Sequence, residues 1–351
     1  MIDRRRALLY CAGGGIGDSL VASVVARALH TRYEQVDALT LPSHCATLER
    51  VPDIDTVLAD SGDDEAALAE NLRQRSYDAC VVTWASARTA RVAWRSGIGV
   101  RVGQASRLYS WRFTHRVPVR SERGDVTTHW SHILLDYARV LGCDTDDTHP
   151  RFVPTPADER AAEQLRAEVP GELTPFIILH PTNAIAPLRP AWPTDGWVRL
   201  ARSLAQRYDT RILVSGAPAD REIAERIATA GGASSIAGRL GIGGFGALAR
   251  RTRAFVGITT GTMHVAAAVG APTVGIFPFQ SDVPDRWAPL GSATAVVRAS
   301  FPCHAADTKE HCADYACIAN LDIPRIIAAV DTCLRLAAPN DAPLSGRSAA
   351  Y

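Results

Sequence analysis

The chain is 351 residues long, has 38 lysines and arginines against 37 aspartates and glutamates, and is 47% apolar. This length and apolar content suffice for two domains with complete cores. The formal net charge of +1 provides no overall attraction to nucleic acid, and no stretch approaches the ~20 apolar residues needed to cross a bilayer. The N-terminus shows no signal-peptide pattern, so we expect a cytoplasmic protein.

The first predicted elements are a buried strand over residues 7–12 and a helix over residues 19–30, joined by the turn GGGIGD. Such a turn lets an anion approach the backbone N–H groups at a helix N-terminus. The spacing differs from G-x-G-x-x-G because Asp18 takes the place of the third glycine, and no G-K-[ST] follows. Two interpretations stay open: Asp18 or Ser19 caps the helix, or Asp18 is a carboxylate at the bottom of a cleft.

Strands and helices alternate through the rest of the first half. We expect strands at residues 36–41, 78–84 and 97–102, and helices at residues 64–75 and 127–141. This alternation is typical of an α/β domain. A proline-rich, charged passage over residues 148–164 then breaks the rhythm, and we interpret it as the linker between two domains.

The first half also contains a basic segment with a single acid, Glu122. Its nine arginines are Arg88, Arg91, Arg95, Arg101, Arg107, Arg112, Arg116, Arg120 and Arg123. Tyr109, Trp111 and Phe113 lie among them, and arginines beside aromatic residues are typical of a surface that docks on anionic lipid. In the alternative interpretation the aromatic residues alternate along a strand and face the core, while the arginines face water.

The second half alternates more regularly. The expected strands cover residues 176–180, 211–215, 254–256 and 273–277, and the expected helices cover residues 194–208, 219–230 and 261–269. Short βα units of this kind form a parallel sheet whose ligands bind beyond the carboxyl ends of the strands. We therefore expect four loops, HPTNAIAPLRPAWP, SGAPAD, AGRLGIGG and GITTGTMH, to meet at one crevice.

These loops contain side chains suited to a nucleoside diphosphate. Thr259, Thr260, Gly261 and Thr262 begin a helix whose N–H groups can bind a diphosphate without a metal ion, and His264 follows one turn later. Arg189 offers a cation to a leaving phosphate. Asp220 suits either a helix cap or a ribose contact.

The eight cysteines do not predict a metal site. Four are scattered, at Cys11, Cys45, Cys80 and Cys143, and we expect them to be small core residues. The other four are clustered near the end, at Cys303, Cys312, Cys317 and Cys333. No C-x-x-C spacing occurs, so neither zinc nor a redox pair is expected, and the role of the cluster is left open.

Several motifs in order resemble glycosyltransferase family 9, the ADP-heptose:lipopolysaccharide heptosyltransferases. They are GGIGDSLVASVVARAL, HPTN…WP, GAPADRE and GTMHVAAAVGAPTVGIF, and the similarity covers essentially the whole chain. The resemblance implies an α/β fold of the GT-B type, with two Rossmann-like domains that face a cleft. Residues 1–155 would then bind the acceptor substrate, residues 156–338 the sugar nucleotide, and residues 339–351 would be a tail.

The resemblance also implies roles for individual residues. Asp18 matches the family's proposed general base, and Gly15 and Gly17 bring its turn to the mouth of the cleft. The residues that match donor-binding positions are Thr182, Asn183, Arg189, Asp220, Leu240, Thr260, Gly261 and His264. Two positions depart from the family: Thr259 stands where an aspartate is usual, and Arg189 lies three residues before Trp192 rather than two.

We therefore predict an inverting glycosyltransferase that needs no metal or other cofactor. By resemblance it moves a heptose from ADP-heptose to the phosphorylated inner core of lipopolysaccharide, with Arg107 and Arg112 on the acceptor side and a peripheral contact with the anionic inner face of the inner membrane. No nucleic-acid partner is expected. The alternatives are a transferase for a secondary metabolite or a protein, and a degenerate sugar-nucleotide-binding protein without catalysis.

Overall fold

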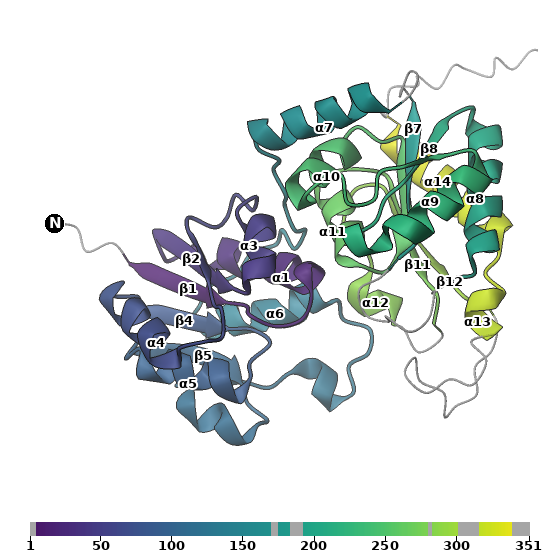
Figure 1. The fold of residues 1–351 in the computed structure, drawn as a ribbon. Coiled ribbons are helices and arrows are strands. Elements are labelled where there is room, and N and C mark those ends of the chain that lie inside the picture. The colour runs from purple at the N-terminus through teal and green to yellow at the C-terminus, as the bar shows by residue number, and fades with distance from the viewer. Residues whose placement is uncertain (1–4, 170–174, 183–191, 280–282, 301–315, 339–351) are drawn as a thin grey trace, which may run out of the picture.

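The computed structural model describes residues 5–169, 175–182, 192–279, 283–300 and 316–338. The predictions for Asn183, Arg189, Cys303, Cys312 and the tail fall outside these ranges. Figure 1 shows two units, formed by the first and second halves of the chain, each with a parallel sheet and surrounding helices. The predicted pair of Rossmann-like domains is therefore confirmed, while their limits at residues 155 and 338 stay predictions.

In the described residues, the N-terminal sheet has six parallel strands in the order β3-β2-β1-β4-β5-β6. Its strands are β1 (Arg6–Tyr10), β2 (Gln35–Thr40), β3 (Val57–Ala59), β4 (Ala79–Val82), β5 (Val100–Gln104) and β6 (His115–Val117). Its helices are α1 (Ile16–Ala22), α2 (Val24–Leu29), α3 (Pro42–Leu48), α4 (Glu65–Gln74), α5 (Ala87–Arg95), η1 (Leu108–Arg112), η2 (Arg120–Arg123) and α6 (Trp130–Arg139). The order changes direction between β1 and β4, which places a crevice beyond their carboxyl ends.

The C-terminal sheet has the strand order β12-β11-β10-β7-β8-β9. Its strands are β7 (Phe176–His180), β8 (Arg211–Val214), β9 (Ser234–Ser235), β10 (Ala254–Ile258), β11 (Thr273–Phe277) and β12 (Thr294–Arg298). Its helices are α7 (Pro156–Glu168), α8 (Thr194–Tyr208), η3 (Pro218–Asp220), α9 (Arg221–Gly231), α10 (Ile242–Ala249), α11 (Gly261–Ala268), α12 (Pro284–Trp287), α13 (Ala316–Ala319) and α14 (Ile323–Ala337). The order changes direction between β7 and β10, so the loops that follow these strands border the second crevice.

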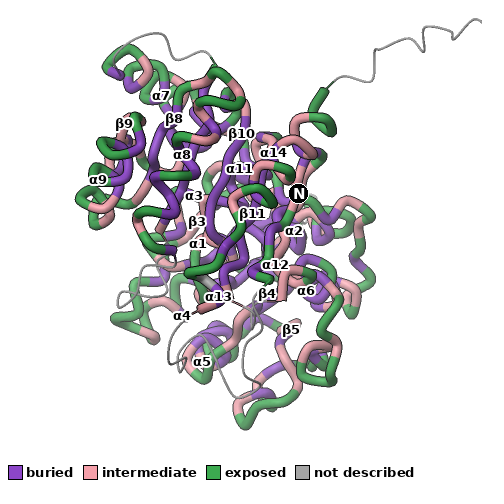
Figure 2. Tube along the Cα trace, turned by 90° about the vertical axis from the view of Figure 1, so that its right-hand side faces the viewer, coloured by how far each residue is buried: buried purple, intermediate pink, exposed green. Residues whose placement is uncertain are grey.

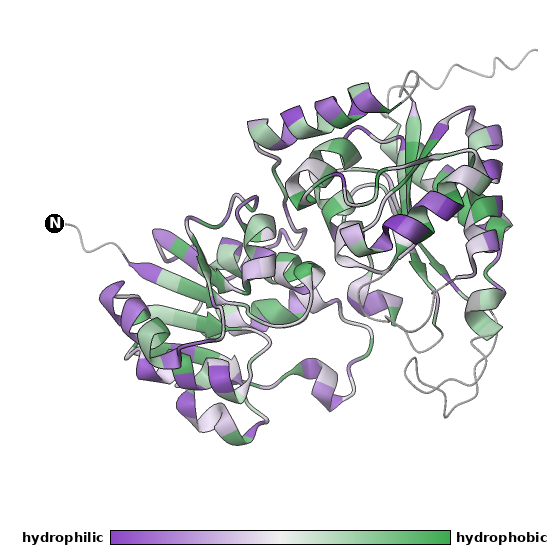
Figure 3. Cartoon of the chain, viewed as in Figure 1, coloured by the Kyte–Doolittle hydropathy of each residue, from purple (hydrophilic) through white to green (hydrophobic). Residues whose placement is uncertain are grey.

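The sheets are covered by helices, and their central strands are apolar runs without alternation. Leu8 and Leu9 of β1 are both fully buried although they face opposite sides of the sheet. Figure 2 shows buried strands behind helices with exposed outer faces, and Figure 3 shows the same strands as hydrophobic. One apolar cluster joins Leu20 of α1 to Met263 of α11, so the core continues from one domain into the other.

A charged pair also ties the two domains together. Arg50, which follows α3, donates from Nε and Nη2 to the two carboxylate oxygens of Asp158 in α7, each at 2.8 Å. Asp158 also accepts from the backbone N–H of Thr155, the N-cap residue of α7, at 2.8 Å and so completes the capping box of this helix. Burial acts to raise the pKa of Asp158, but the hydrogen bonds from Arg50 and Thr155 outweigh it and hold the pKa at about 2. A Cβ on Gly243 of α10 would overlap this pair, so α10 depends on a glycine there.

Several local predictions need correction. The predicted helix over residues 19–30 is interrupted at Ser23, whose hydroxyl donates to the carbonyl oxygen of Leu20 at 2.6 Å and so competes with the helical pattern. The linker predicted over residues 148–164 is wrong from Pro156 onward, because Pro156–Glu168 forms α7. Thr155 caps this helix and Pro156 occupies its first position, a start signal that the charged composition obscured. The aromatic residues near Trp111 do not alternate along a strand, because Leu108–Arg112 forms the 3₁₀ helix η1.

Asp158→Ala removes the carboxylate half of the capping box of α7 and leaves Arg50 without its carboxylate. We expect the free energy of unfolding to fall by roughly 3 kcal/mol, measured by urea denaturation. Arg50→Ala should cost less, because the cap remains. Glu70→Ala, which breaks the exposed pair with Arg73, is the control and should cost less than about 0.5 kcal/mol. If Asp158→Ala lowers the free energy of unfolding no more than Glu70→Ala does, the pair of Arg50 with Asp158 does not stabilise the contact between the domains.

Candidate functional site

A cavity of about 1070 Å³ lies between the two domains and is lined by both of them. It brings together predicted site residues that are far apart in the sequence. These are Gly15, Gly17, Asp18, Thr182, Asp220, Leu240, Thr259, Thr260, Gly261, Thr262 and His264. Arg107 and Arg112 do not line it. A cavity of this volume can hold a nucleotide sugar together with part of a second substrate.

Asp18 lies in the first turn of α1 and acts both as a cap and as a cleft carboxylate. Its Oδ2 accepts a hydrogen bond from the backbone N–H of Gly15 at 2.7 Å. Gly14 has a φ of +70°, and a Cβ there would lie 2.5 Å from Cγ of Asp18, so the tight turn requires glycine. Burial raises the pKa of Asp18 above its ordinary value, although the hydrogen bond from Gly15 opposes the shift. Apart from Gly15 and the backbone N–H of Asp18 itself, none of the described residues donates a hydrogen bond to this carboxylate, and a carboxylate made more basic by burial suits proton transfer.

The N-terminus of α1 meets the N-terminus of α11 at two glycines. A Cβ on Gly17 would lie 2.9 Å from Cδ2 of His264 and 3.1 Å from Cα of Gly261. A Cβ on Gly261 would in turn lie 2.9 Å from the backbone nitrogen of Gly17 and would overlap Ile16. The contact therefore depends on two missing side chains, and it places Asp18 beside the first turn of α11.

The first turn of α11 offers hydrogen-bond donors to the cavity. Thr260 precedes the helix in an extended conformation, and its hydroxyl lies 2.7 Å from the hydroxyl of Thr262. The first N–H groups of a helix lack partners within the helix and together attract an anion. Burial lowers the pKa of His264 to about 3, so this imidazole is neutral and contributes one N–H donor rather than a positive charge.

Asp220 lies at the opposite edge of the C-terminal crevice, at the end of η3. Its Oδ2 accepts hydrogen bonds from Oγ1 of Thr182 at 2.7 Å and from the backbone N–H of Ala217 at 2.8 Å. A Cβ on Gly216 would lie 2.8 Å from Cβ of Asp220, so a glycine is needed for this approach. The fixed carboxylate keeps Oδ1 for a diol such as that of a ribose. Ile236, Leu240, Ile242 and Phe245 add an apolar slot suited to a flat base.

The sequence alone did not identify His180 and Ser215, which also line the cavity. The hydroxyl of Ser215 donates to the carbonyl oxygen of Leu179 at 3.1 Å and accepts from Nδ1 of His180 at 2.9 Å. Burial lowers the pKa of His180 to about 4, so the ring is neutral. The available signal was the position of His180, at the last residue of a predicted strand whose carboxyl end borders the crevice.

Arg286 and Trp287 of α12 were missed as well, and both line the cavity. Nη2 of Arg286 donates to the carbonyl oxygen of Asp125 in the N-terminal domain at 2.5 Å. The ring of Trp287 lies 6.4 Å from that of His264. Proline at the start of α12 signals a short helix, but no local pattern predicts that this helix crosses to the other domain.

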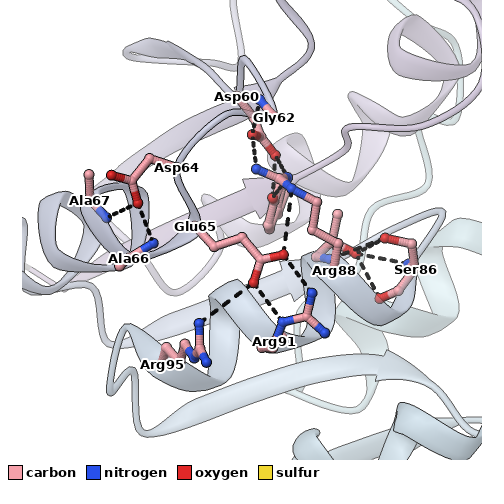
Figure 4. A network of polar contacts seen from close by, with 12 residues as sticks. Asp60, Gly62, Asp64, Glu65, Ala66, Ala67, Ser86, Arg88, Arg91 and Arg95 are labelled. Atoms are coloured by element: carbon pink, nitrogen blue, oxygen red, sulfur yellow. Dashed lines mark hydrogen bonds and ion pairs between the residues drawn. The ribbon is translucent and has the colours of Figure 1, made fainter.

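The acceptor side of the N-terminal domain differs from the predicted basic surface. Figure 4 shows Arg88, Arg91 and Arg95 on one face of α5, turned toward two acids from other segments. Arg88 donates to both oxygens of the buried Asp60, at 2.5 and 2.7 Å, and Arg91 does the same with Glu65, at 2.5 and 2.6 Å. Much of the positive charge is therefore neutralised by acids that the segment itself lacks.

Within the described residues, not every arginine of the segment is paired with an acid from elsewhere in the chain. Arg107 pairs with Glu122, whereas Arg112, Arg116 and Arg123 have no carboxylate partner in the part of the chain that the structure describes. The guanidinium of Arg112 lies 4.4 Å from the ring centre of Trp111. Three large apolar side chains are exposed nearby, Trp94 at 45%, Leu108 at 98% and Trp111 at 55%. We call Trp94, Leu108, Trp111, Arg112, Arg116 and Arg123 the Trp111 surface.

Within the described ranges, no three His, Cys, Asp or Glu side chains are grouped to hold a metal ion. None of the helices found there is long and apolar enough to cross a membrane. Cys11, Cys80, Cys143 and Cys333 are buried, and the thiol of Cys333 donates to the carbonyl oxygen of Thr273 at 3.5 Å. Cys11, Cys80 and Cys143 are core residues as predicted, while Cys45 is only partly buried.

Two Rossmann-like domains that face one cleft form the architecture of the GT-B fold, which is found in glycosyltransferases. A family model described as glycosyltransferase family 9 (heptosyltransferase) matches residues 65–316. Lipopolysaccharide heptosyltransferase 1 of Pseudomonas aeruginosa is 30% identical over 142 residues, which are 40% of this chain and 38% of that protein.

Solved structures of family 9 enzymes have the same fold. The family 9 glycosyltransferase of Veillonella parvula has a TM-score of 0.80 at 17% identity, over 95% of this chain and 98% of that one. The E. coli ADP-heptose lps heptosyltransferase II has a TM-score of 0.75 at 20% identity, over 94% and 98%. The chain belongs to glycosyltransferase family 9 and is a glycosyltransferase with the GT-B fold, as the sequence motifs predicted.

Gly261→Ala places a methyl group against Gly17 and Ile16, so α1 and α11 must separate. We expect transfer to fall by about tenfold or more, because small displacements of reacting groups carry large losses in rate. Gly99→Ala is the matched control, since a Cβ there meets no atom within 4 Å. Initial rates and melting temperatures of both variants provide the measurement. Wild-type rates for Gly261→Ala would show that the glycine contact is not needed in the active enzyme.

Proposed function

We propose that this enzyme transfers a heptose from ADP-heptose to a hydroxyl group of an acceptor substrate, with inversion at the anomeric carbon. One observation carries the proposal: Asp18, a partly buried carboxylate whose Oδ1 accepts no hydrogen bond from another described residue, lies across a glycine contact from the N-terminus of α11. A base and a site for a leaving diphosphate then share one cavity, as a direct displacement requires. The names of the family and of the E. coli enzyme support heptose and ADP.

In the proposed reaction, Asp18 takes the proton of the attacking hydroxyl while that oxygen bonds to the anomeric carbon. The bond from the anomeric carbon to the diphosphate oxygen breaks on the opposite face, which inverts the configuration. The N–H groups of α11 and the neutral His264 donate hydrogen bonds to the leaving diphosphate. These donors take the place that a metal ion has in other transferases, so the reaction needs none.

The other cavity residues position the donor. Asp220, held by Thr182 and Ala217, accepts hydrogen bonds from the ribose hydroxyls. The slot around Leu240 holds the base between apolar side chains. Asn183 and Arg189 are further contacts to the phosphates in this proposal, as the family motifs imply.

For the acceptor substrate we propose the phosphorylated inner core of lipopolysaccharide, in line with the name of the Pseudomonas relative. The Trp111 surface supports this choice, because its arginines suit anionic head groups and its tryptophans suit the boundary between water and acyl chains. The enzyme would then be cytoplasmic and bind peripherally to the inner face of the inner membrane.

Thr259 favours a second candidate, since it lines the cavity where the family usually has an aspartate. A changed contact to the donor fits a transferase that modifies a secondary metabolite or a protein. A sugar-nucleotide-binding protein without catalysis would also lack that acid, but the free oxygen of Asp18 argues for catalysis. Assays with a panel of nucleotide sugars and acceptors distinguish the candidates.

Asp18→Asn should lower kcat by about 100-fold or more, because the amide cannot take the proton, while the Kd for ADP stays within about twofold. Asp220→Asn offers the contrast, since it should weaken ADP binding. Initial rates and calorimetric titration with ADP supply both quantities. Full turnover by Asp18→Asn would show that Asp18 is only a helix cap.

Arg112→Glu combined with Arg116→Glu should abolish binding to vesicles that contain anionic lipid, without lowering the melting temperature. Vesicle flotation at increasing salt is the measurement, and the wild-type protein should dissociate as the screening length falls to ~8 Å. Arg202→Glu with Arg226→Glu on α8 and α9 supplies a charge-matched control. Normal vesicle binding by the first variant, or none by the wild-type protein, would contradict membrane docking through the Trp111 surface.

A further inference from the structure

Three tryptophans from separate segments meet where the two domains touch. Trp84 follows β4, Trp130 begins α6, and Trp287 ends α12 of the C-terminal domain. The ring centres lie 4.7 Å apart for Trp84 and Trp130, 6.1 Å for Trp84 and Trp287, and 5.7 Å for Trp130 and Trp287. Each of the three is partly buried and packs against the apolar core, and Trp287 also lines the cavity. We call these three residues the tryptophan cluster.

The tryptophan cluster borders the turn that holds Asp18. A Cβ on Gly13, in that turn, would lie 2.9 Å from Cβ of Trp84. Trp287 lines the same cavity as Asp18 and lies beside His264, which itself contacts Gly17. In Figure 1, α12 and α10 lie on opposite sides of α11. Helix α10, which contributes two residues to the base slot, and helix α12, which ends with Trp287, thus lie on different sides of α11.

Trp84 has an unusual backbone conformation. Its φ of +53° is in the left-handed region, which a bulky side chain adopts only when its surroundings impose it. The residue follows β4 at the point where the N-terminal sheet changes strand order, the place where open α/β sheets bind ligands. The strain therefore points to a role for this indole at the crevice.

Beside the tryptophan cluster, Arg286 of α12 is a cation with a hydrogen-bond donor that has no partner among the described residues. Arg286 has no carboxylate partner in the described part of the chain, and its Nε is buried without a hydrogen-bond partner. Its Nη2 is bound to the carbonyl oxygen of Asp125, and Nε2 of His129 donates to the carbonyl oxygen of Ala288 at 3.1 Å. These two hydrogen bonds fix α12 against the N-terminal domain, so the guanidinium is held at the cavity wall.

We propose that the tryptophan cluster and Arg286 form the subsite for the acceptor substrate, and that this subsite binds a pyranose ring with an acidic group. This inference rests on the proposed function. The C–H face of a sugar ring carries partial positive charge and packs on the negative face of an indole. A guanidinium binds a carboxylate or a phosphate through paired hydrogen bonds. A sugar held there has its hydroxyl groups next to Asp18.

The test compares Trp287→Leu, Trp287→Phe and Arg286→Gln with the wild-type enzyme, using ADP-heptose and deacylated lipopolysaccharide core oligosaccharide. Trp287→Leu and Arg286→Gln should each raise KM for the oligosaccharide by about tenfold, with the Kd for ADP within about twofold. Trp287→Phe keeps an aromatic face and should stay within about threefold. Arg226→Gln on α9 is the matched control for loss of an arginine and should change neither value.

Four results would contradict the proposed acceptor subsite. An unchanged KM in Trp287→Leu, or an equal loss of ADP binding and acceptor binding, would assign the tryptophan cluster to packing between the domains and overturn the subsite. Transfer by the wild-type enzyme only to hydroxyls that are not on sugars would also overturn the subsite and leave glycosyl transfer intact. A wild-type protein that neither binds ADP nor transfers heptose would overturn both proposals.

Discussion

The close contact between Gly17 and Gly261 is the constraint on which the rest of the site depends. Because neither residue has a side chain, the N-termini of α1 and α11 approach until a single Cβ would collide with the opposite backbone. Two other sets of contacts hold the domains in this arrangement. They are the ion pair of Arg50 with Asp158 of α7 and the hydrogen bonds between the N-terminal domain and the segment of α12. The proposed catalytic geometry is thus a property of the domain contact, since neither crevice alone holds both Asp18 and α11.

Burial sets the charge pattern of the cavity. It raises the pKa of Asp18 and lowers the pKa values of His180 and His264, so the cavity contains a more basic carboxylate and two neutral imidazoles. The positive potential for a diphosphate comes from the first turn of α11, with Arg286 nearby on α12. Thr259 lines the same cavity with a neutral hydroxyl, which adds no negative charge to oppose this potential.

The sequence predicted those parts of the fold whose signals are local. Residues 176–180, 194–208 and 273–277 form β7, α8 and β11 with the predicted limits, because each is an apolar or amphipathic run bounded by breakers. The motifs around Asp18 and Thr260 likewise identified residues that line one cavity. Features made by tertiary contact could not be predicted in this way. The acids that neutralise Arg88 and Arg91 lie 28 and 26 residues away, and the tryptophan cluster joins three segments from both domains. No periodicity or spacing in one segment reports such partners.

In the proposed mechanism, the base and the leaving group meet across the glycine contact. A crystal structure of the enzyme with ADP bound would test this arrangement. We expect diphosphate oxygens about 3 Å from the backbone nitrogens of the first turn of α11, with Gly17 still packed on Gly261 and Oδ1 of Asp18 facing the same space. A diphosphate bound elsewhere, or domains parted so that Asp18 no longer shares a cavity with α11, would contradict it.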